Sequence, residues 1–122
     1  MKKSIIISCL ILTGILTACS AKEYVNQNTY ELSVGDQLEL YYTTNSCCYY
    51  CFNGEELQHL EYIDDRVMIP YEDGCDGCDQ TEAFVFEAKS VGVDTIYMAL
   101  VEGGEDCRID KSSAQKYVVT VK

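Results

Sequence analysis

The segment YELSVGDQLELYY, residues 30–42, decides the fold class of this chain. Apolar side chains alternate with polar ones on both sides of a turn at Gly35-Asp36, and a period of two is typical of strands that bury one face. Turn residues separate six further candidate strands, at 49–52, 57–63, 67–71, 84–88, 95–101 and 117–121. Residues 57–63 also fit a short helix, although a strand is favoured, and Pro70 indicates an edge position. Because no long helix or βαβ unit is indicated, we predict an all-β fold, an antiparallel β-sandwich of about seven strands.

The first residues have the order of a secretory signal. Lys2 and Lys3 precede an apolar run from Ile5 to Leu16, and small residues then lead to Cys19. This order resembles a bacterial lipoprotein signal, in which the cysteine is lipidated and becomes the first residue of the mature chain. The apolar run is too short to span a bilayer, so we interpret it as a leader that is removed. A secreted protein that is cleaved elsewhere, with Cys19 incidental, is the alternative.

This interpretation divides the chain into a lipoprotein signal peptide at 1–18, a lipidated N-terminus and tether at 19–28, and a β-sandwich domain at 29–122. The protein is then exported and lipid-anchored to the bacterial cell envelope. Ser20 follows the cysteine where Asp would indicate inner-membrane retention, so the outer membrane or cell surface is favoured.

The charge of the mature chain restricts its partners. The leader holds two of the nine basic residues, so seven Lys and Arg remain against 20 Asp and Glu, a net charge of −13. Such a surface repels nucleic acid and anionic lipid, which excludes both as binding partners of the domain itself. A solvated exterior explains the charge, and a cationic partner is the alternative. We expect a monomer.

Six cysteines remain after Cys9 and Cys19 are set aside: Cys47, Cys48, Cys51, Cys75, Cys78 and Cys107. All six fall in or beside predicted connections, namely those between strands two and three, four and five, and six and seven. These connections emerge at one end of an immunoglobulin-like sandwich. An exported chain with six cysteines predicts three disulfides. If each cysteine of the first connection pairs with another connection, the 15 possible connectivities reduce to six.

Two details of the cysteine spacing bear on this prediction. Adjacent Cys47 and Cys48 are poor partners for each other, because a bond between neighbours strains the peptide geometry. The pairs Cys48-x-x-Cys51 and Cys75-x-x-Cys78 also have the spacing of a zinc site, which is the main alternative. A redox motif at Cys75-x-x-Cys78 requires a following helix, and the sequence predicts none there.

No other constellation indicates catalysis. His59 is the only histidine and has no nucleophile near it in the sequence, so ordinary packing is favoured. Asp73, Asp76 and Asp79 lack the alternate-residue pattern of an EF-hand calcium loop and indicate a solvated acidic loop. We therefore predict that the protein is not an enzyme and has no cofactor and no metal site.

The order of elements resembles that of the chagasin-type inhibitors of papain-like cysteine peptidases, over roughly residues 30–122. Val34-Gly35-Asp36 opens a Leu-x-Leu strand, and an Asn-led loop then ends in aromatic residues. A Gly-containing loop precedes Phe84-Val85-Phe86, Gly92 precedes the next strand, and 117–121 form the last one. The resemblance implies an immunoglobulin-like sandwich with three loops at one end. In this family those loops form a wedge that enters the peptidase cleft and covers the catalytic thiol.

The family's loop motifs are only partly present. Its first loop reads Asn-Pro-Thr-Thr-Gly-Tyr-x-Trp where this chain has NSCCYYCF at 45–52, so two threonines have become cysteines and the glycine has become Tyr49. The Arg-Pro-Trp of its third loop falls at Glu102-Gly103-Gly104, without a match. By position, the resemblance implies these inhibitory-loop candidates: Asn45, Ser46, Tyr49, Tyr50, Phe52, Gly74, Gly77, Glu102, Gly103 and Gly104.

Two functions follow as hypotheses. The first is a membrane-anchored inhibitor of papain-like cysteine peptidases that occludes the active site with this wedge. The second is a non-inhibitory recognition or structural module that presents an acidic, cystine-tied loop tip.

Overall fold

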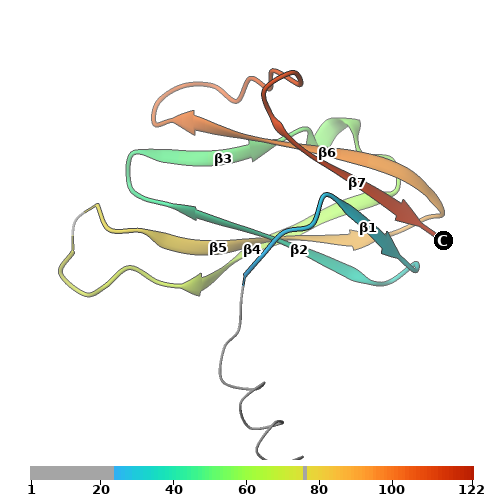
Figure 1. Ribbon diagram of the computed structural model, residues 1–122, viewed down its shortest axis with the longest axis horizontal. Coiled ribbons are helices and arrows are strands. Elements are labelled where there is room, and N and C mark those ends of the chain that lie inside the picture. The colour runs from blue at the N-terminus through green and yellow to red at the C-terminus, as the bar shows by residue number, and fades with distance from the viewer. Residues whose placement is uncertain (1–23, 76) are drawn as a thin grey trace, which may run out of the picture.

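The computed structural model describes residues 24–75 and 77–122 and has two stacked β-sheets (Figure 1). One sheet has the order β1-β7-β6-β3, formed by β1 (Thr29–Leu32), β7 (Gln115–Val121), β6 (Gly92–Glu102) and β3 (Cys48–Phe52). The other has the order β2-β5-β4, formed by β2 (Gln37–Thr44), β5 (Gln80–Ala88) and β4 (Leu60–Ile69). A short 3₁₀ turn, η1 (Gly54–Glu56), follows β3. The predicted all-β sandwich is confirmed.

The core lies between the sheets and is built from the inward positions of the alternating strands. Leu38, Leu40 and Tyr42 of β2 are buried there, beside Phe84 and Phe86 of β5. The facing sheet contributes a further buried set: Ile96, Met98, Tyr117, Val119 and Val121. The segment quoted first in the sequence therefore supplies one wall of the core, as its period of two predicts.

Two predicted strands are one strand in the structure. The segments 57–63 and 67–71 fall largely within the continuous β4, which pairs with β5 along its whole length. The register shifts between Tyr62 and Asp64 and again between Val67 and Ile69. Each bulge inserts one residue and interrupts the period of two, which is why the sequence pattern divides there. β4 is an edge strand of its sheet, in agreement with Pro70 directly after it.

The expectation of a purely antiparallel sandwich was wrong for one pair. β1 runs parallel to β7, with Tyr30 opposite Val119. The other strand pairs are antiparallel. β1 and β7 come from opposite ends of the chain and are not joined by a hairpin, so no short connection fixes their relative direction.

The predicted signal peptide and lipidation site, including Cys19, lie outside the described residues. Residues 24–28, from the predicted tether, contact the domain directly. Asn26 donates to the backbone oxygen of Tyr41 and accepts from its N–H, both at 2.8 Å, and the Tyr24 ring packs 4.9 Å from the Tyr41 ring. Within the described residues, the structure has no helix long and apolar enough to cross a membrane.

Candidate functional site

Three connections that bear cysteines emerge at the same end of the sandwich, on the left in Figure 1. They join β2 to β3 (45–47), β4 to β5 (70–79, described except for Asp76) and β6 to β7 (103–114). We call this region the loop end. The prediction that the cysteine-bearing connections gather at one end is confirmed by this placement.

The β2–β3 connection is a tight turn that Asn45 organises. The Asn45 side-chain oxygen accepts from the Cys47 N–H at 3.0 Å, the local bond that makes Asn common in turns. The Cys47 carbonyl oxygen then accepts from the Gly103 N–H of the β6–β7 connection at 2.8 Å. A Cβ at Gly103 would lie only 3.1 Å from that oxygen, so glycine permits this close approach. Ser46 and Cys47 are exposed at the tip.

The six cysteines form three disulfides, as expected. Cys51 of β3 bonds Cys107 of the β6–β7 connection, whereas Cys47 bonds its neighbour Cys48, and Cys75 bonds Cys78. Cys51 alone of the three first-connection cysteines pairs with another connection, so the condition that reduced the connectivities to six is not met. The expectation that Cys47 and Cys48 are poor partners was wrong. Cys48 and Cys51 also lie within β3 rather than beside it. Their side chains leave β3 on opposite faces because residues three apart in a strand have opposite orientations.

This pairing also contradicts the zinc alternative. Cys48 and Cys51 belong to different disulfides, and Cys75 is oxidised with Cys78, so neither Cys-x-x-Cys pair presents two thiolates. Across residues 24–75 and 77–122, no group of three or more His, Cys, Asp or Glu side chains is placed to hold a metal ion. Cys78 is followed by strand β5 rather than by a helix, which matches the argument against a redox motif.

The β6–β7 connection lies against β3 rather than projecting freely. The Tyr49 hydroxyl donates to the Glu105 carbonyl oxygen at 2.6 Å, and the Cys51–Cys107 bond lies two residues further along each segment. Asp110 organises the return, since its side chain accepts from the Ser112 N–H at 3.0 Å and hydroxyl at 2.6 Å. These hydrogen bonds to the carboxylate lower the pKa of Asp110.

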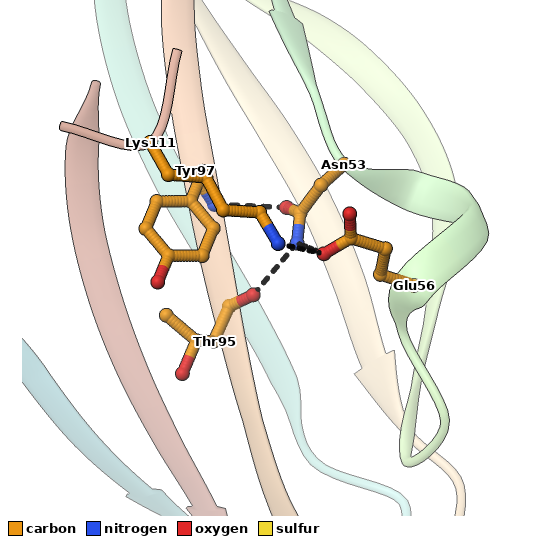
Figure 2. Close-up of polar contacts among 5 residues, drawn as sticks. All are labelled: Asn53, Glu56, Thr95, Tyr97 and Lys111. Atoms are coloured by element: carbon orange, nitrogen blue, oxygen red, sulfur yellow. Dashed lines mark hydrogen bonds and ion pairs between the residues drawn. The ribbon is translucent and has the colours of Figure 1, made fainter. Parts of the chain in front are cut away.

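A polar cluster fixes the far part of this connection (Figure 2). Asn53, at the end of β3, donates to the Thr95 oxygen at 2.9 Å and accepts from the Tyr97 N–H at 2.8 Å, so it joins β3 to β6. The Lys111 ammonium contacts Glu56 at 2.8 Å and lies 5.2 Å from the centre of the Tyr97 ring. The Lys111 hydrogen bond lowers the pKa of Glu56, and the same bond raises the pKa of Lys111. The Asn53 contacts were not predicted, because the Asn-Gly pair at 53–54 indicates only a turn.

The β4–β5 connection completes the loop end. Gly74 and Gly77 have φ values of 77° and 81°, which favour glycine because a Cβ is strained in that region. The Cys75 N–H donates to the Glu72 oxygen at 3.1 Å, and the Cys75–Cys78 bond closes this turn. A shallow cleft of about 610 Å³ lies between this connection and Ser46 of the first one.

The structure separates the ten candidate residues into two groups. The first group is exposed or partly exposed at the loop end: Asn45, Ser46, Tyr49, Gly74, Gly77, Glu102, Gly103 and Gly104. The second group, Tyr50 and Phe52, points toward the core. The Tyr50 ring packs 4.2 Å from the Tyr42 ring, and the Phe52 ring lies 5.1 Å from the Phe86 ring. These two aromatics support β3 from within.

Beside β3 the two sheets leave an open cleft of about 640 Å³. Its walls include the aromatic side chains Tyr49, Tyr50, Phe52, Tyr62, Tyr71 and Phe84. Asp65 lies in the same wall and accepts from the Tyr62 hydroxyl at 2.5 Å. Burial and this hydrogen bond raise the pKa of Tyr62. The cleft continues from the loop end along the side of the sandwich, because Asn45 and Ser46 also line it.

The opposite end of the sandwich holds His59, which packs as an ordinary structural residue. Its Nδ1 lies 2.9 Å from the Ser90 hydroxyl, and its ring occupies the space that a Cβ at Gly92 would need. Near it, the buried Asp94 carboxylate accepts from the backbone N–H groups of Gln58, His59 and Leu60, at 2.8 to 3.2 Å. Sequence reasoning missed Asp94, whose only signal was an acidic residue at the start of an apolar strand.

No protein-family model and no curated protein matches the chain. Among solved structures, the chain is similar to the crystal structure of the cysteine protease inhibitor EhICP2 from Entamoeba histolytica. The TM-score is 0.54 at 16% sequence identity, and the match covers 77% of this chain and 86% of that chain. At this level of identity the likeness establishes the fold. The fold that the chagasin-type resemblance implied is therefore confirmed.

Proposed function

We propose that this protein inhibits papain-like cysteine peptidases, and that the loop end is the wedge that occludes the peptidase active site. The observation that carries the proposal is the joining of the β2–β3 turn, strand β3 and the β6–β7 connection into one unit, on a fold shared with a cysteine protease inhibitor. The Gly103–Cys47 hydrogen bond joins the β2–β3 and β6–β7 connections, and the Cys51–Cys107 bond and the Tyr49–Glu105 hydrogen bond join the β6–β7 connection to β3. Loops already held in their bound shape lose less conformational entropy on association.

The wedge works by exclusion and involves no covalent chemistry in this basic form. The exposed turn at 45–47 forms its centre, with 70–79 and 103–114 on its flanks. Tyr49 supplies a rigid aromatic side chain with 41% of its surface exposed, a residue type that often dominates such contacts. Tyr50 and Phe52 hold the strand beneath the centre in place.

The test is inhibition of a panel of papain-like peptidases by the mature chain, residues 19–122, with Cys19→Ser so that no lipid is attached. We expect competitive inhibition that weakens at least about tenfold in Ser46→Arg, because the larger side chain stands at the centre of the wedge. Val91→Arg is the matched control, since Val91 is 66% exposed in the β5–β6 connection, at the opposite end, and should leave inhibition unchanged. Equal effects of the two variants, with both folded, would contradict the wedge.

A specific observation favours the second hypothesis, a non-inhibitory recognition module. The third connection presents Glu102, Gly103 and Gly104 where the inhibitor family carries Arg-Pro-Trp, so an aromatic anchor is absent and a charge is reversed. Absence of inhibition across the panel by a folded, oxidised chain would transfer the function of the loop end to a partner other than a peptidase.

We propose in addition that the chain is exported and anchored to the cell envelope through lipid on Cys19. Two or three acyl chains at about 0.8 kcal/mol per buried CH₂ bind a membrane stably, whereas a single chain binds marginally. Cys19→Ser should abolish incorporation of labelled palmitate and release the protein from the membrane fraction. Cys9→Ser is the matched control within the leader and should retain the label. Label retained in the Cys19 variant would contradict lipidation there.

A further inference from the structure

The Cys47–Cys48 disulfide does not act as a structural staple. A disulfide stabilises a fold mainly by closing a loop of the unfolded chain, and the benefit grows with the length of that loop. Cys51 and Cys107 are 56 residues apart, whereas Cys47 and Cys48 are already joined by a peptide bond. This disulfide therefore brings no separate parts of the chain together.

Its position and geometry are those of a reactive bond. The two Cα atoms are 3.8 Å apart, below the usual range of about 4.4 to 6.8 Å for disulfides. Cys47 is exposed at the tip of the β2–β3 turn. Disulfides outside the usual geometry, and exposed ones, are the ones that thiols open most readily.

The surrounding contacts hold the turn in place independently of this bond. Asn45 accepts from the Cys47 N–H at 3.0 Å, and Gly103 donates to the Cys47 oxygen at 2.8 Å. Cys51–Cys107 anchors the following strand. Opening of Cys47–Cys48 therefore leaves the tip where it was.

We propose that Cys47–Cys48 is a reversible covalent trap for the catalytic thiol of the target peptidase. This inference rests on the proposed function, which brings the tip to that thiol. The catalytic cysteine of such peptidases is a thiolate because a protonated histidine lies beside it. The thiolate attacks Cys47 Sγ, the peptidase–Cys47 bond forms, the Cys47–Cys48 bond breaks, and Cys48 leaves as a thiolate that takes up a proton. The peptidase cysteine is oxidised and Cys48 is reduced, so no further oxidant is needed.

One neighbour favours the trapped state. Glu102 lies directly opposite Cys48 in the β3–β6 pair, and directly paired residues have side chains on the same face. A carboxylate beside a thiol disfavours the thiolate. The thiolate is the attacking form, so a carboxylate on this face slows the return attack of Cys48 on the mixed disulfide.

The experiment mixes reduced papain, freed of reductant, with the oxidised mature chain carrying Cys19→Ser, under anaerobic conditions and with an acid quench. Non-reducing mass spectrometry should show a 1:1 adduct whose mass is the sum of the two proteins, and peptide mapping should place the bond at Cys47. Inhibition should deepen with time and be reversed by dithiothreitol. Papain alkylated at its catalytic cysteine should give no adduct.

Two double variants separate the thiol–disulfide exchange from the non-covalent inhibition by the wedge. Cys47→Ser with Cys48→Ser should lose the adduct, and dithiothreitol should no longer change its inhibition. Cys75→Ser with Cys78→Ser removes the other short-range disulfide of the loop end and should retain the adduct.

The outcomes are distinct. Inhibition without an adduct overturns the trap and leaves the proposed function standing. Absence of both inhibition and adduct rejects both. Glutathione, at equal thiolate concentration, serves as the reference thiol that forms a mixed disulfide with the chain. If the papain adduct forms no faster than the glutathione adduct, the trap is overturned, because the wedge then contributes no positioning. A rate at least about tenfold faster is the expected result, since bound reactants gain effective concentration.

Discussion

At the scale of single residues, Asp94 is the polar group whose loss should destabilise the fold most. Its carboxylate is 6% exposed and accepts from three consecutive backbone N–H groups at the start of β4. Asp94→Ala would leave these donors without partners, at about 1–3 kcal/mol for each buried one. We expect the free energy of unfolding to fall by about 3 kcal/mol or more, measured by urea denaturation with the disulfides intact.

The matched control for that variant is Asp79→Ala, which removes an exposed carboxylate and should change the free energy of unfolding by less than about 0.5 kcal/mol. Asp94→Asn retains one side-chain acceptor and should fall between the two. A loss for Asp94→Ala no larger than the loss for Asp79→Ala would mean that water satisfies the three N–H groups.

Buried tyrosines should make the fold sensitive to alkali. Burial and a hydrogen bond with Tyr117 raise the pKa of Tyr42 far above its ordinary value of about 10, and a hydrogen bond to Glu39 raises the pKa of Tyr41 to about 12. The folded state keeps these protons while the unfolded chain releases them. The stability is therefore fully present below pH 10 and falls as pH rises through 10 toward 12. The urea midpoint should be constant from pH 7 to 9 and lower at pH 11.

Tyr42→Phe tests the largest of these contributions. Loss of the hydroxyl removes its hydrogen bonds to Tyr117 and Gln115, so the neutral-pH free energy of unfolding should fall by about 1 kcal/mol. The decrease in stability between pH 9 and 11 should become smaller than in the parent chain. An unchanged pH dependence would assign the alkaline sensitivity to other groups.

At the scale of elements, the pattern of apolar residues predicted most strands because most of them bury one face and expose the other. β2 and β7 follow this rule most closely, and their core residues were visible in the sequence, whereas the central strand β5 is buried on both faces from Ala83 to Phe86. β4 does not, because its two bulges shift the period, and most of its length is exposed at a sheet edge. The parallel direction of β1 depends on contacts with the other end of the chain, which no local pattern encodes.

The loop end likewise combines features that follow from strand order, which were predicted, with features that depend on individual contacts, which were not. Strand order placed the three cysteine-bearing connections together, since that follows from topology. Disulfide pairing depends on where individual Cβ atoms point, and the β3 register directs Cys51 toward Cys107 and away from Cys48. The Asn45 turn with its Gly103 contact is likewise a matter of distances that the sequence does not contain.

Among the elements, the link between β3 and the β6–β7 connection should contribute most to stability. For the 56-residue separation of Cys51 and Cys107, the loss of loop-closure entropy in the unfolded chain corresponds to about 4 kcal/mol. Cys51→Ala with Cys107→Ala should lower the free energy of unfolding by that order, as measured by urea denaturation. The matched pair Cys75→Ala with Cys78→Ala opens a loop between residues three apart and should cost about 2 kcal/mol or less. Equal losses would mean that strain or unfolded-state structure outweighs the entropy of closure.

At the scale of the whole molecule, the excess of acidic groups gives the loop end a negative field. Glu72, Asp73, Glu102, Glu105 and Asp106 are all exposed there, on a chain with a formal net charge of −11 at pH 7. Such a field accelerates encounters with positively charged partners and slows encounters with negatively charged ones. Under the proposed function, the choice among target peptidases should therefore depend on their charge as well as on the fit of the wedge.

The corresponding measurement is the association rate as a function of salt, by stopped-flow or surface binding. The Debye length falls from about 30 Å at 0.01 M to about 8 Å at 0.15 M ionic strength. Over this range the rate for a peptidase of positive net charge should fall by about tenfold or more, and the rate for one of negative net charge should rise.

Glu105→Lys and Glu55→Lys change the net charge equally, but only Glu105 lies at the loop end, whereas Glu55 lies in η1. With the positive peptidase, Glu105→Lys should slow association more. Equal slowing would show that total charge, rather than the field at the wedge, steers the encounter.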